Sequence, residues 1–149
     1  MKAKLEDFLS ENFSATEGEI KEVRDRFKPL RVKKNELLQD TGNICQSVYF
    51  VESGCLRTFF DDGDGKEATR YVALEGQFIG PIHSFMDQSP SQEFIGAVES
   101  SELLSISHLD FRDGLKTIPL FKDMYTLFLE RAYAMNYWRI EILLKHTAK

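Results

Sequence analysis

Residues suited to ligand binding gather between Val72 and Val98, a stretch that we call the cradle segment. Its order is a glycine turn at Gly76, a short apolar strand ending in Gly80, a brief helical piece, a polar loop and another strand. Glycine is common where the backbone must approach another group closely. The cradle segment therefore predicts a shallow depression with a backbone floor, in which a ligand can be held.

Catalysis is not indicated by the histidines and serines. His83, His108 and His146 lie far apart in the sequence, and only His83 falls in the strand-rich part. A metalloenzyme built on a β-barrel needs two or three histidines and a carboxylate pointing inward. Ser84 and Ser91 lack the Gly-x-Ser-x-Gly setting of a nucleophilic serine. We therefore expect no catalytic residue, no metal site and no enzymatic activity.

Two further patterns begin like metal or redox sites without completing them. Residues 62–65, Asp-Gly-Asp-Gly, start like a calcium loop, but Lys66 and Glu67 stand where such a loop needs an oxygen ligand and a glycine. Cys45 and Cys55 are too few for an iron–sulfur cluster and lack a close spacing. Two such thiols are typical of a reducing compartment, so we expect a cytoplasmic protein.

The composition predicts one domain that does not bind nucleic acid over its whole surface. The chain has 149 residues, of which 42% are hydrophobic, and its net charge is −5. A nucleic-acid-binding surface carries a basic patch, whereas the basic residues here are scattered. No apolar run approaches the ~20 residues of a membrane span, so we expect no membrane partner. We divide the single domain, residues 1–149, into N-terminal helices (1–28), a β-barrel (29–107) and C-terminal helices (108–149).

Helical signals occupy the first 28 residues. Apolar residues at helical spacing predict a first short helix around residues 5–9. Thr16 and Glu19 have the spacing of a capping box, in which each side chain accepts a hydrogen bond from the backbone of the other residue. The helix that they begin is predicted to include Phe27 and to stop before Pro29, because the residue before a proline avoids the helical conformation.

From residue 30 to residue 107, short strands alternate with turns. Runs typical of strands fall at residues 30–33, 47–51, 56–60 and 69–72, and turn-forming residues separate them. The glycines in the turn at residues 62–65 favour a hairpin, since glycine adopts a positive φ at low cost. Many short strands at even spacing are typical of a β-sandwich or a jelly-roll barrel. With helices on both flanks, the fold class is predicted to be α+β.

A long helix is predicted from Leu120 to about His146, because this stretch contains no proline or glycine and Pro119 suits a first helical position. Its apolar residues do not fit one stripe. One face carries Phe121, Met124, Phe128, Ala132 and Met135, and a second surface carries Leu129, Tyr133, Tyr137, Ile140 and Leu144. A helix this broadly apolar must be covered on more than one side. Either a second copy covers the outer surface in a homodimer, or the helix lies flat on its own barrel.

Four motifs, in this order and at this spacing, resemble those of cyclic-nucleotide-binding domains. They are residues 37–42 (LLQDTG), 48–54 (VYFVESG), 64–67 (DGKE) and 76–80 (GQFIG). The last of these resembles the glycine motif that opens the family's phosphate-binding cassette. The resemblance extends from about residue 15 through the long helix, and the whole resembles the sensor half of a Crp/Fnr-type bacterial transcription regulator. It implies a jelly-roll barrel (a double-stranded β-helix) with N-terminal helices and a C-terminal dimerisation helix.

The resemblance implies a ligand site made by the cradle segment and the long helix. Pro81 stands where members that bind cyclic AMP carry a glutamate for the ribose, and Ser91 stands where they carry an arginine for the phosphate. A hydroxyl group cannot replace a bidentate cation. The implied ligand is a cyclic nucleotide or another small anion, with weak or absent binding of cyclic AMP. The candidate residues are Phe78, Ile79, Gly80, Pro81, Ile82, His83, Ser91, Gln92, Glu93, Asn136 and Tyr137.

Asn136 and Tyr137 match the positions from which the family's long helix reaches the purine. The amide of Asn136 has donor and acceptor groups that suit a base edge. Alternatively, Asn136 is a polar residue that sets the register of a dimer seam. The sequence leaves both roles open.

Two functional hypotheses follow from the resemblance. In the first, the chain is a regulatory sensor domain of a Crp/Fnr-like transcription regulator with degenerate or altered cyclic nucleotide binding. In the second, it is a dimeric scaffold that keeps the fold but binds no small molecule. The expected partner is a second copy of the chain through the C-terminal helix. DNA contacts are expected only through a helix-turn-helix, which these 149 residues do not contain.

Overall fold

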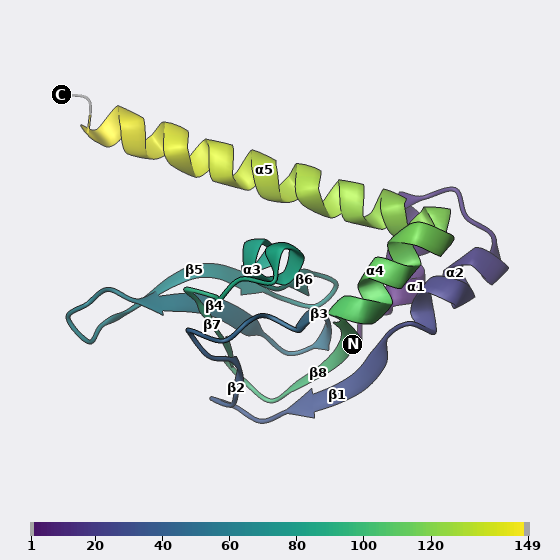
Figure 1. The fold of residues 1–149 in the computed structure, drawn as a ribbon, viewed down its shortest axis with the longest axis horizontal. Coiled ribbons are helices and arrows are strands. Elements are labelled where there is room, and N and C mark those ends of the chain that lie inside the picture. The colour runs from purple at the N-terminus through teal and green to yellow at the C-terminus, as the bar shows by residue number, and fades with distance from the viewer. Residues whose placement is uncertain (1, 148–149) are drawn as a thin grey trace.

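Helices flank eight strands in the computed structural model, which describes residues 2–147 (Figure 1). The helices are α1 (Leu5–Asn12), α2 (Glu17–Arg24), α3 (Ile82–Asp87), α4 (His108–Thr117) and α5 (Pro119–Thr147). The strands are β1 (Lys28–Val32), β2 (Leu37–Gln39), β3 (Ser47–Ser53), β4 (Leu56–Asp61), β5 (Glu67–Ala73), β6 (Phe78–Ile79), β7 (Phe94–Ala97) and β8 (Ser101–Ser107). This order confirms the predicted α+β class with a long C-terminal helix.

The capping box at the start of α2 is confirmed. Thr16 Oγ1 accepts a hydrogen bond from the Glu19 amide at 3.2 Å, and the Glu19 carboxylate accepts one from the Thr16 amide at 3.0 Å. These bonds to the charged carboxylate lower the pKa of Glu19. The helix ends at Arg24, earlier than predicted. Phe27 lies beyond it because the backbone tightens into a turn, in which the Phe27 amide donates to the Arg24 carbonyl at 3.0 Å.

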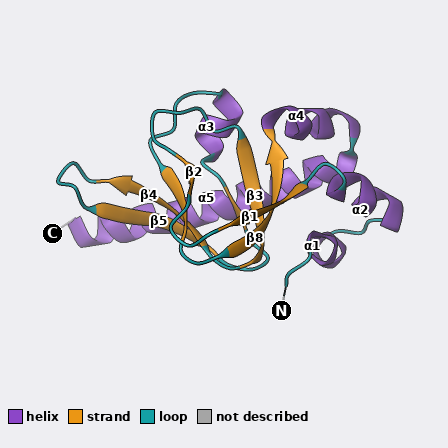
Figure 2. Ribbon diagram, turned by 90° about the horizontal axis from the view of Figure 1, so that it is seen from below, coloured by secondary structure: helices purple, strands orange, loops and turns teal. Residues whose placement is uncertain are grey.

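The strands form two four-stranded antiparallel sheets, with the orders β1-β8-β3-β6 and β2-β7-β4-β5. The predicted jelly-roll arrangement is confirmed as two sheets, but they do not close into a continuous barrel (Figure 2). The predicted hairpin joins β4 to β5. At its tip, Asp62 Oδ1 accepts hydrogen bonds from the amides of Asp64 and Lys66 at 2.9 and 3.2 Å. The carboxylate that began the calcium-like pattern therefore stabilises a turn.

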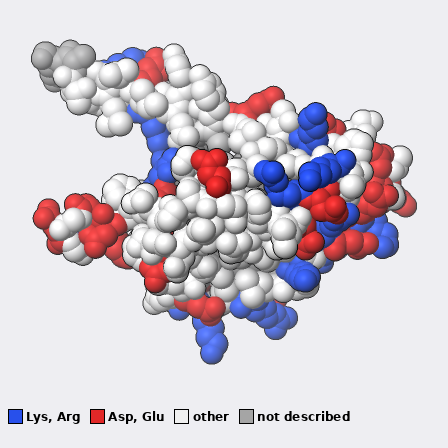
Figure 3. All heavy atoms as spheres, in the orientation of Figure 1, with Lys and Arg blue, Asp and Glu red and all other residues white. Residues whose placement is uncertain are grey.

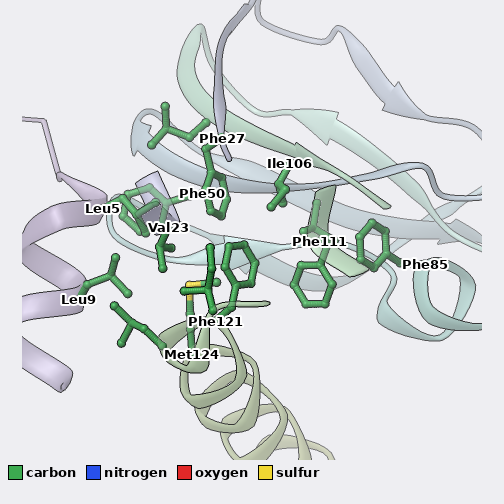
Figure 4. Packing of buried hydrophobic residues seen from close by; sticks show 14 of the residues in the cluster. Leu5, Leu9, Val23, Phe27, Phe50, Phe85, Ile106, Phe111, Phe121 and Met124 are labelled. Atoms are coloured by element: carbon green, nitrogen blue, oxygen red, sulfur yellow. The ribbon is translucent and has the colours of Figure 1, made fainter. Parts of the chain in front are cut away.

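The larger hydrophobic cluster lies where the helices meet the first sheet, and most of its members are phenylalanines and leucines (Figure 4). Phe111 of α4 is at its centre, with its ring 5.2 Å from that of Phe85 and 5.6 Å from that of Phe121. A second cluster lies among the strands and includes Val51, Leu103 and other small or branched residues. The first cluster fixes the start of α5 and the end of α3 against the same sheet.

The long helix α5 is buried only at its beginning. Leu120, Phe121 and Met124 belong to the core, whereas large apolar residues farther along are exposed, including Tyr137 at 59%. With 29 residues, α5 is about 43 Å long at ~1.5 Å per residue, and Figure 1 shows it extending past the sheets. Among residues 2–147, no helix combines the length and apolar character needed to cross a membrane.

Candidate ligand-binding site

A cavity of about 620 Å³ lies between the cradle segment, β5 and the inner side of α5. The strands and α3 form one wall and α5 forms the other. Residues 124–139 of α5 line it at intervals of three or four positions, which is the spacing of one helical face. Figure 3 shows open space between the outer half of α5 and the β4–β5 hairpin, with basic atoms on the underside of the helix.

Ten of the eleven residues predicted for the ligand site line this cavity. They are Phe78, Ile79, Gly80, Pro81, Ile82, His83, Ser91, Gln92, Glu93 and Asn136. Tyr137 does not line it. Its ring lies on the outer surface of α5, stacked on that of Tyr133 with 6.3 Å between the ring centroids. Successive helical residues differ by about 100° in direction, and Tyr137 lies one step beyond Met135 and Asn136, the adjacent pair that lines the cavity.

Gly80 is required by a contact within the protein. A Cβ atom at this position would lie 2.4 Å from Val48 Cγ1 on β3. The short strand β6 pairs with β3, which places Ile79 opposite Tyr49 and brings Gly80 onto the Val48 side chain. The close backbone approach predicted for this glycine is confirmed, but its neighbour is a core valine.

Ser91 shapes the loop before β7. Its hydroxyl donates to the Glu93 carbonyl at 2.9 Å and accepts from the Glu93 amide at 3.0 Å. Its own amide donates to the Asn43 carbonyl at 2.9 Å, and its carbonyl accepts from the Gly42 amide at 2.9 Å. The residue is buried. Its polar groups thus hold two loops together.

A second set of hydrogen bonds holds α3 in place. Ser84 Oγ accepts from the Cys45 amide at 2.9 Å and donates to the Ser89 carbonyl at 2.5 Å. The Gln88 amide side chain donates to the carbonyls of Cys45 and Phe85 at 3.2 and 2.7 Å. The histidine of α3, His83, is exposed and pairs with Asp87 at 3.3 Å. Ser84 and Gln88 therefore have local structural partners that account for their polar atoms.

Three arginines that the sequence interpretation missed also line the cavity: Arg70 on β5 and Arg131 and Arg139 on α5. Arg70 forms an ion pair with Glu93, whose carboxylate is largely buried. For the two arginines of α5, helical spacing in the sequence could have revealed their position. Arg131 and Arg139 lie on the same helical face as Asn136, which was predicted to belong to the site. For Arg70, the sequence of β5 shows no pattern that separates an inward face from an outward face, since most of that strand is exposed.

Hydroxyl groups complete the polar lining. The Tyr71 hydroxyl donates to the Phe78 carbonyl at 3.2 Å, and burial raises the pKa of Tyr71, so it remains a neutral donor. Thr58 lies beside it on β4 and is buried. Within residues 2–147, no three His, Cys, Asp or Glu side chains come together as metal ligands would. The cavity is thus equipped to bind a small molecule through arginine, amide and hydroxyl groups.

The crystal structure of the catabolite activator protein of Thermus thermophilus resembles this fold with a TM-score of 0.77 and 22% identity, over 91% of this chain and 62% of that chain. A cyclic nucleotide-binding domain from Methylobacillus flagellatus KT gives a TM-score of 0.80 at 14% identity, over 96% of this chain and 82% of that one. These likenesses establish the fold.

In sequence, the chain is 29% identical over 90 residues to the cyclic AMP receptor protein of Thermus thermophilus. That match covers 60% of this chain but only 41% of the relative. Residues 29–117, which include the whole cradle segment and all of the strands except the first residue of β1, match the family described as the cyclic nucleotide-binding domain. Since the match spans more than half of the 149 residues, the chain belongs to the cyclic nucleotide-binding domain family.

Proposed function

We propose that this domain is the ligand sensor of a Crp/Fnr-type transcription regulator. The observation that carries this proposal is the position of α5, whose inner face lines the cavity while its outer apolar face is exposed. A ligand in the cavity contacts the same helix that carries the outer face. Ligand binding then shifts the helix between two arrangements according to its affinity for each. The similarity to a cyclic AMP receptor protein supports this role over a catalytic one.

The proposed ligand is a cyclic nucleotide or another small anion, bound differently from cyclic AMP in the family. Pro81 and Ser91 line the cavity in place of the glutamate and arginine that the resemblance implies. The Ser91 hydroxyl is already bonded to the Glu93 backbone. These differences support altered recognition of the phosphate. Asn136, which lines the cavity, supports the role of a polar contact to the ligand over that of a register residue.

The proposed assembly is a homodimer in which α5 of one copy packs against α5 of the other. The exposed residues Tyr133, Tyr137, Trp138, Ile140 and Leu144 support it, because large apolar surfaces of this kind mark interaction sites. We further propose that DNA is contacted by a segment outside these 149 residues. The free thiols of Cys45 and Cys55 support a cytoplasmic location.

A thermal-shift screen against cyclic AMP, cyclic GMP, other nucleotides and small anions tests the sensor role. A ligand at ~100 times its dissociation constant stabilises the folded state by about 2.7 kcal/mol. The variant Ala132→Trp fills the cavity and removes this shift, whereas Ala134→Trp, on an exposed part of the same helix, preserves it. If no compound in the screen shifts the transition, the ligand-free dimeric scaffold becomes the better hypothesis. That alternative is favoured by the internal bonding of Ser91.

A further inference from the structure

The lining of the cavity is positively charged although the protein is acidic. Three arginines and one carboxylate, Glu93, leave the lining with two net positive charges, whereas the whole chain has a net charge of −5. A concave site lined with one sign of charge concentrates ions of the opposite sign. The field of the cavity therefore favours an anion.

The arginines retain donors for a ligand. Arg70 donates to Glu93 through Nη1, while its Nε and Nη2 groups have no protein acceptor among residues 2–147. The Arg70 side chain is 50% exposed and that of Glu93 is 11% exposed. A guanidinium has five N–H donors. Arg70 can therefore maintain its ion pair with Glu93 and bind a second acid group at the same time. Within the described part of the chain, Arg131 donates only to the neutral Asn12 side chain, at 3.1 Å.

Most of the remaining lining is apolar. Phe78 lies at its centre, with its ring 5.3 Å from that of Phe8 and 6.3 Å from that of Phe128. Leu127 and Met135 extend this surface along α5. The Arg131 guanidinium lies 5.9 Å from the centroid of the Phe8 ring. Aromatic rings adjacent to arginines match a ligand that combines a flat apolar body with an acid group.

We infer that the cavity binds an organic anion with an apolar body, and that Arg70 on β5, outside the cradle segment, binds its acid group. This inference rests on the proposed sensor function. Glu93 is a positioning residue that holds the guanidinium at the cavity while opposing the anion by its own charge. The cation that Ser91 does not provide is thus supplied by β5, which lies two strands from β7 in the same sheet.

Two fluorescent probes that differ by one acid group test this inference. Anilinonaphthalene sulfonate and N-phenyl-1-naphthylamine share the same aromatic ring system. Only the first carries a sulfonate group, and the second is neutral. We expect Arg70→Met to weaken binding of the sulfonate by about tenfold or more, as for loss of a charge-assisted hydrogen bond. Binding of the neutral probe changes little. Arg31→Met is the matched control, because Arg31 on β1 is 85% exposed and does not line the cavity.

The Glu93→Gln variant tests the opposing charge. It keeps an oxygen that can accept from Arg70 but removes the negative charge, so we expect tighter sulfonate binding and unchanged binding of the neutral probe. If Arg70→Met does not fold because Glu93 is left unpaired, the double variant Arg70→Met with Glu93→Gln removes both charges. The affinities of the two probes are then compared in the double variant. We expect the affinity of the sulfonate probe relative to that of the neutral probe to be lower than in the wild type.

The cavity-filling variant separates failure of this inference from failure of the sensor proposal. If Ala132→Trp prevents binding of both probes but Arg70→Met affects them equally, the cavity binds ligands without using Arg70. The inference is then overturned and the sensor function stands. If Ala132→Trp changes the binding of neither probe, the probes do not bind in the cavity and the inference is overturned, whereas the sensor function is judged by the thermal-shift screen.

Discussion

Ser91 and Glu93 form a closed pair of hydrogen bonds in which one hydroxyl satisfies both backbone groups of a residue two positions away. The family's phosphate-binding arginine falls at Ser91 when the cassettes are aligned without a gap. Restoring that arginine would place a cation at a position that is 2% exposed. The side chain of Ser91 therefore has a structural role in this loop.

Ser91→Arg is predicted to destabilise the domain by about 2–4 kcal/mol, because it removes both bonds to Glu93 and buries a charge. Chemical denaturation measures the free energy of unfolding. Gln92→Arg, at an exposed neighbouring position in the cavity lining, is the control and is expected to change stability by less than about 0.5 kcal/mol. An equally stable Ser91→Arg protein would show that the loop can rearrange to admit the cation.

Gly80→Ala is predicted to cost about 1–3 kcal/mol, because the added Cβ overlaps Val48 and overpacked cores lose stability by that amount. Combining it with Val48→Ala should give a smaller loss than the sum of the two single variants. Gly18→Ala is the control, since its Cβ would meet only Thr16 Oγ1 at 3.9 Å. Additive losses for Gly80 and Val48 would contradict the overlap.

We predict that the folded state becomes less stable at alkaline pH because of the buried thiol of Cys45. Burial raises the pKa of its thiol from 9.0 to about 11. The unfolded chain releases this proton above pH 9 and the folded chain retains it, so the stabilising contribution is complete below pH 9 and is lost as the pH rises to 11. A shift of this size corresponds to about 2–3 kcal/mol.

The difference in unfolding free energy between the wild type and Cys45→Ala isolates this contribution. We expect the difference to decrease between about pH 9 and about pH 11, because most of the other alkaline titrations occur in both proteins. Cys55→Ala should show a smaller change, since the Cys55 thiol is less buried. A difference that does not vary with pH would mean that Cys45 ionises equally in both states.

The outer surface of α5 predicts a dimer whose mass is twice 17.2 kDa. Tyr137→Asp places a charge on this surface and should give a monomer by light scattering at micromolar concentration. Leu109→Glu is the control, because Leu109 is a highly exposed apolar residue on α4, away from the proposed seam. A monomeric wild-type protein, or a dimer lost equally in both variants, would contradict pairing through α5.

The features predicted correctly from the sequence have local causes. The capping box at Thr16, the β4–β5 hairpin and the extent of α5 depend on residues close together in the chain. Sheet pairing was not predicted, since β1 pairs with β8 across roughly 70 residues and the two sheets remain separate. The end of α2 was placed too late because its final turn depends on where β1 begins.

The candidate site was predicted where it follows one continuous segment and missed where it depends on packing. From motif order alone, the sequence identified nine residues of the cradle segment that line the cavity. Arg70 was missed because the direction of a strand residue depends on register, and the β4–β5 pairing shifts between Thr58 and Phe59. Tyr137 was assigned to the site because matching by position does not resolve which way adjacent helical residues point.

Helix α5 is buried only near its first residues, so a small tilt of the helix gives a larger displacement at its C-terminal end. Its buried residues end at Met124, although Phe128 and Arg131 still contact the rest of the domain. From Met124, 23 further residues lead to Thr147 at the far end of the described helix. That arm is about 34 Å long, so a tilt of about 5° around Met124 moves its tip by about 3 Å. Arg131 and Arg139 lie part-way along the arm, where a small displacement at the cavity becomes a larger one at the tip. Short side-chain movements inside the domain are thereby converted into a change of position that a neighbouring segment or subunit can detect.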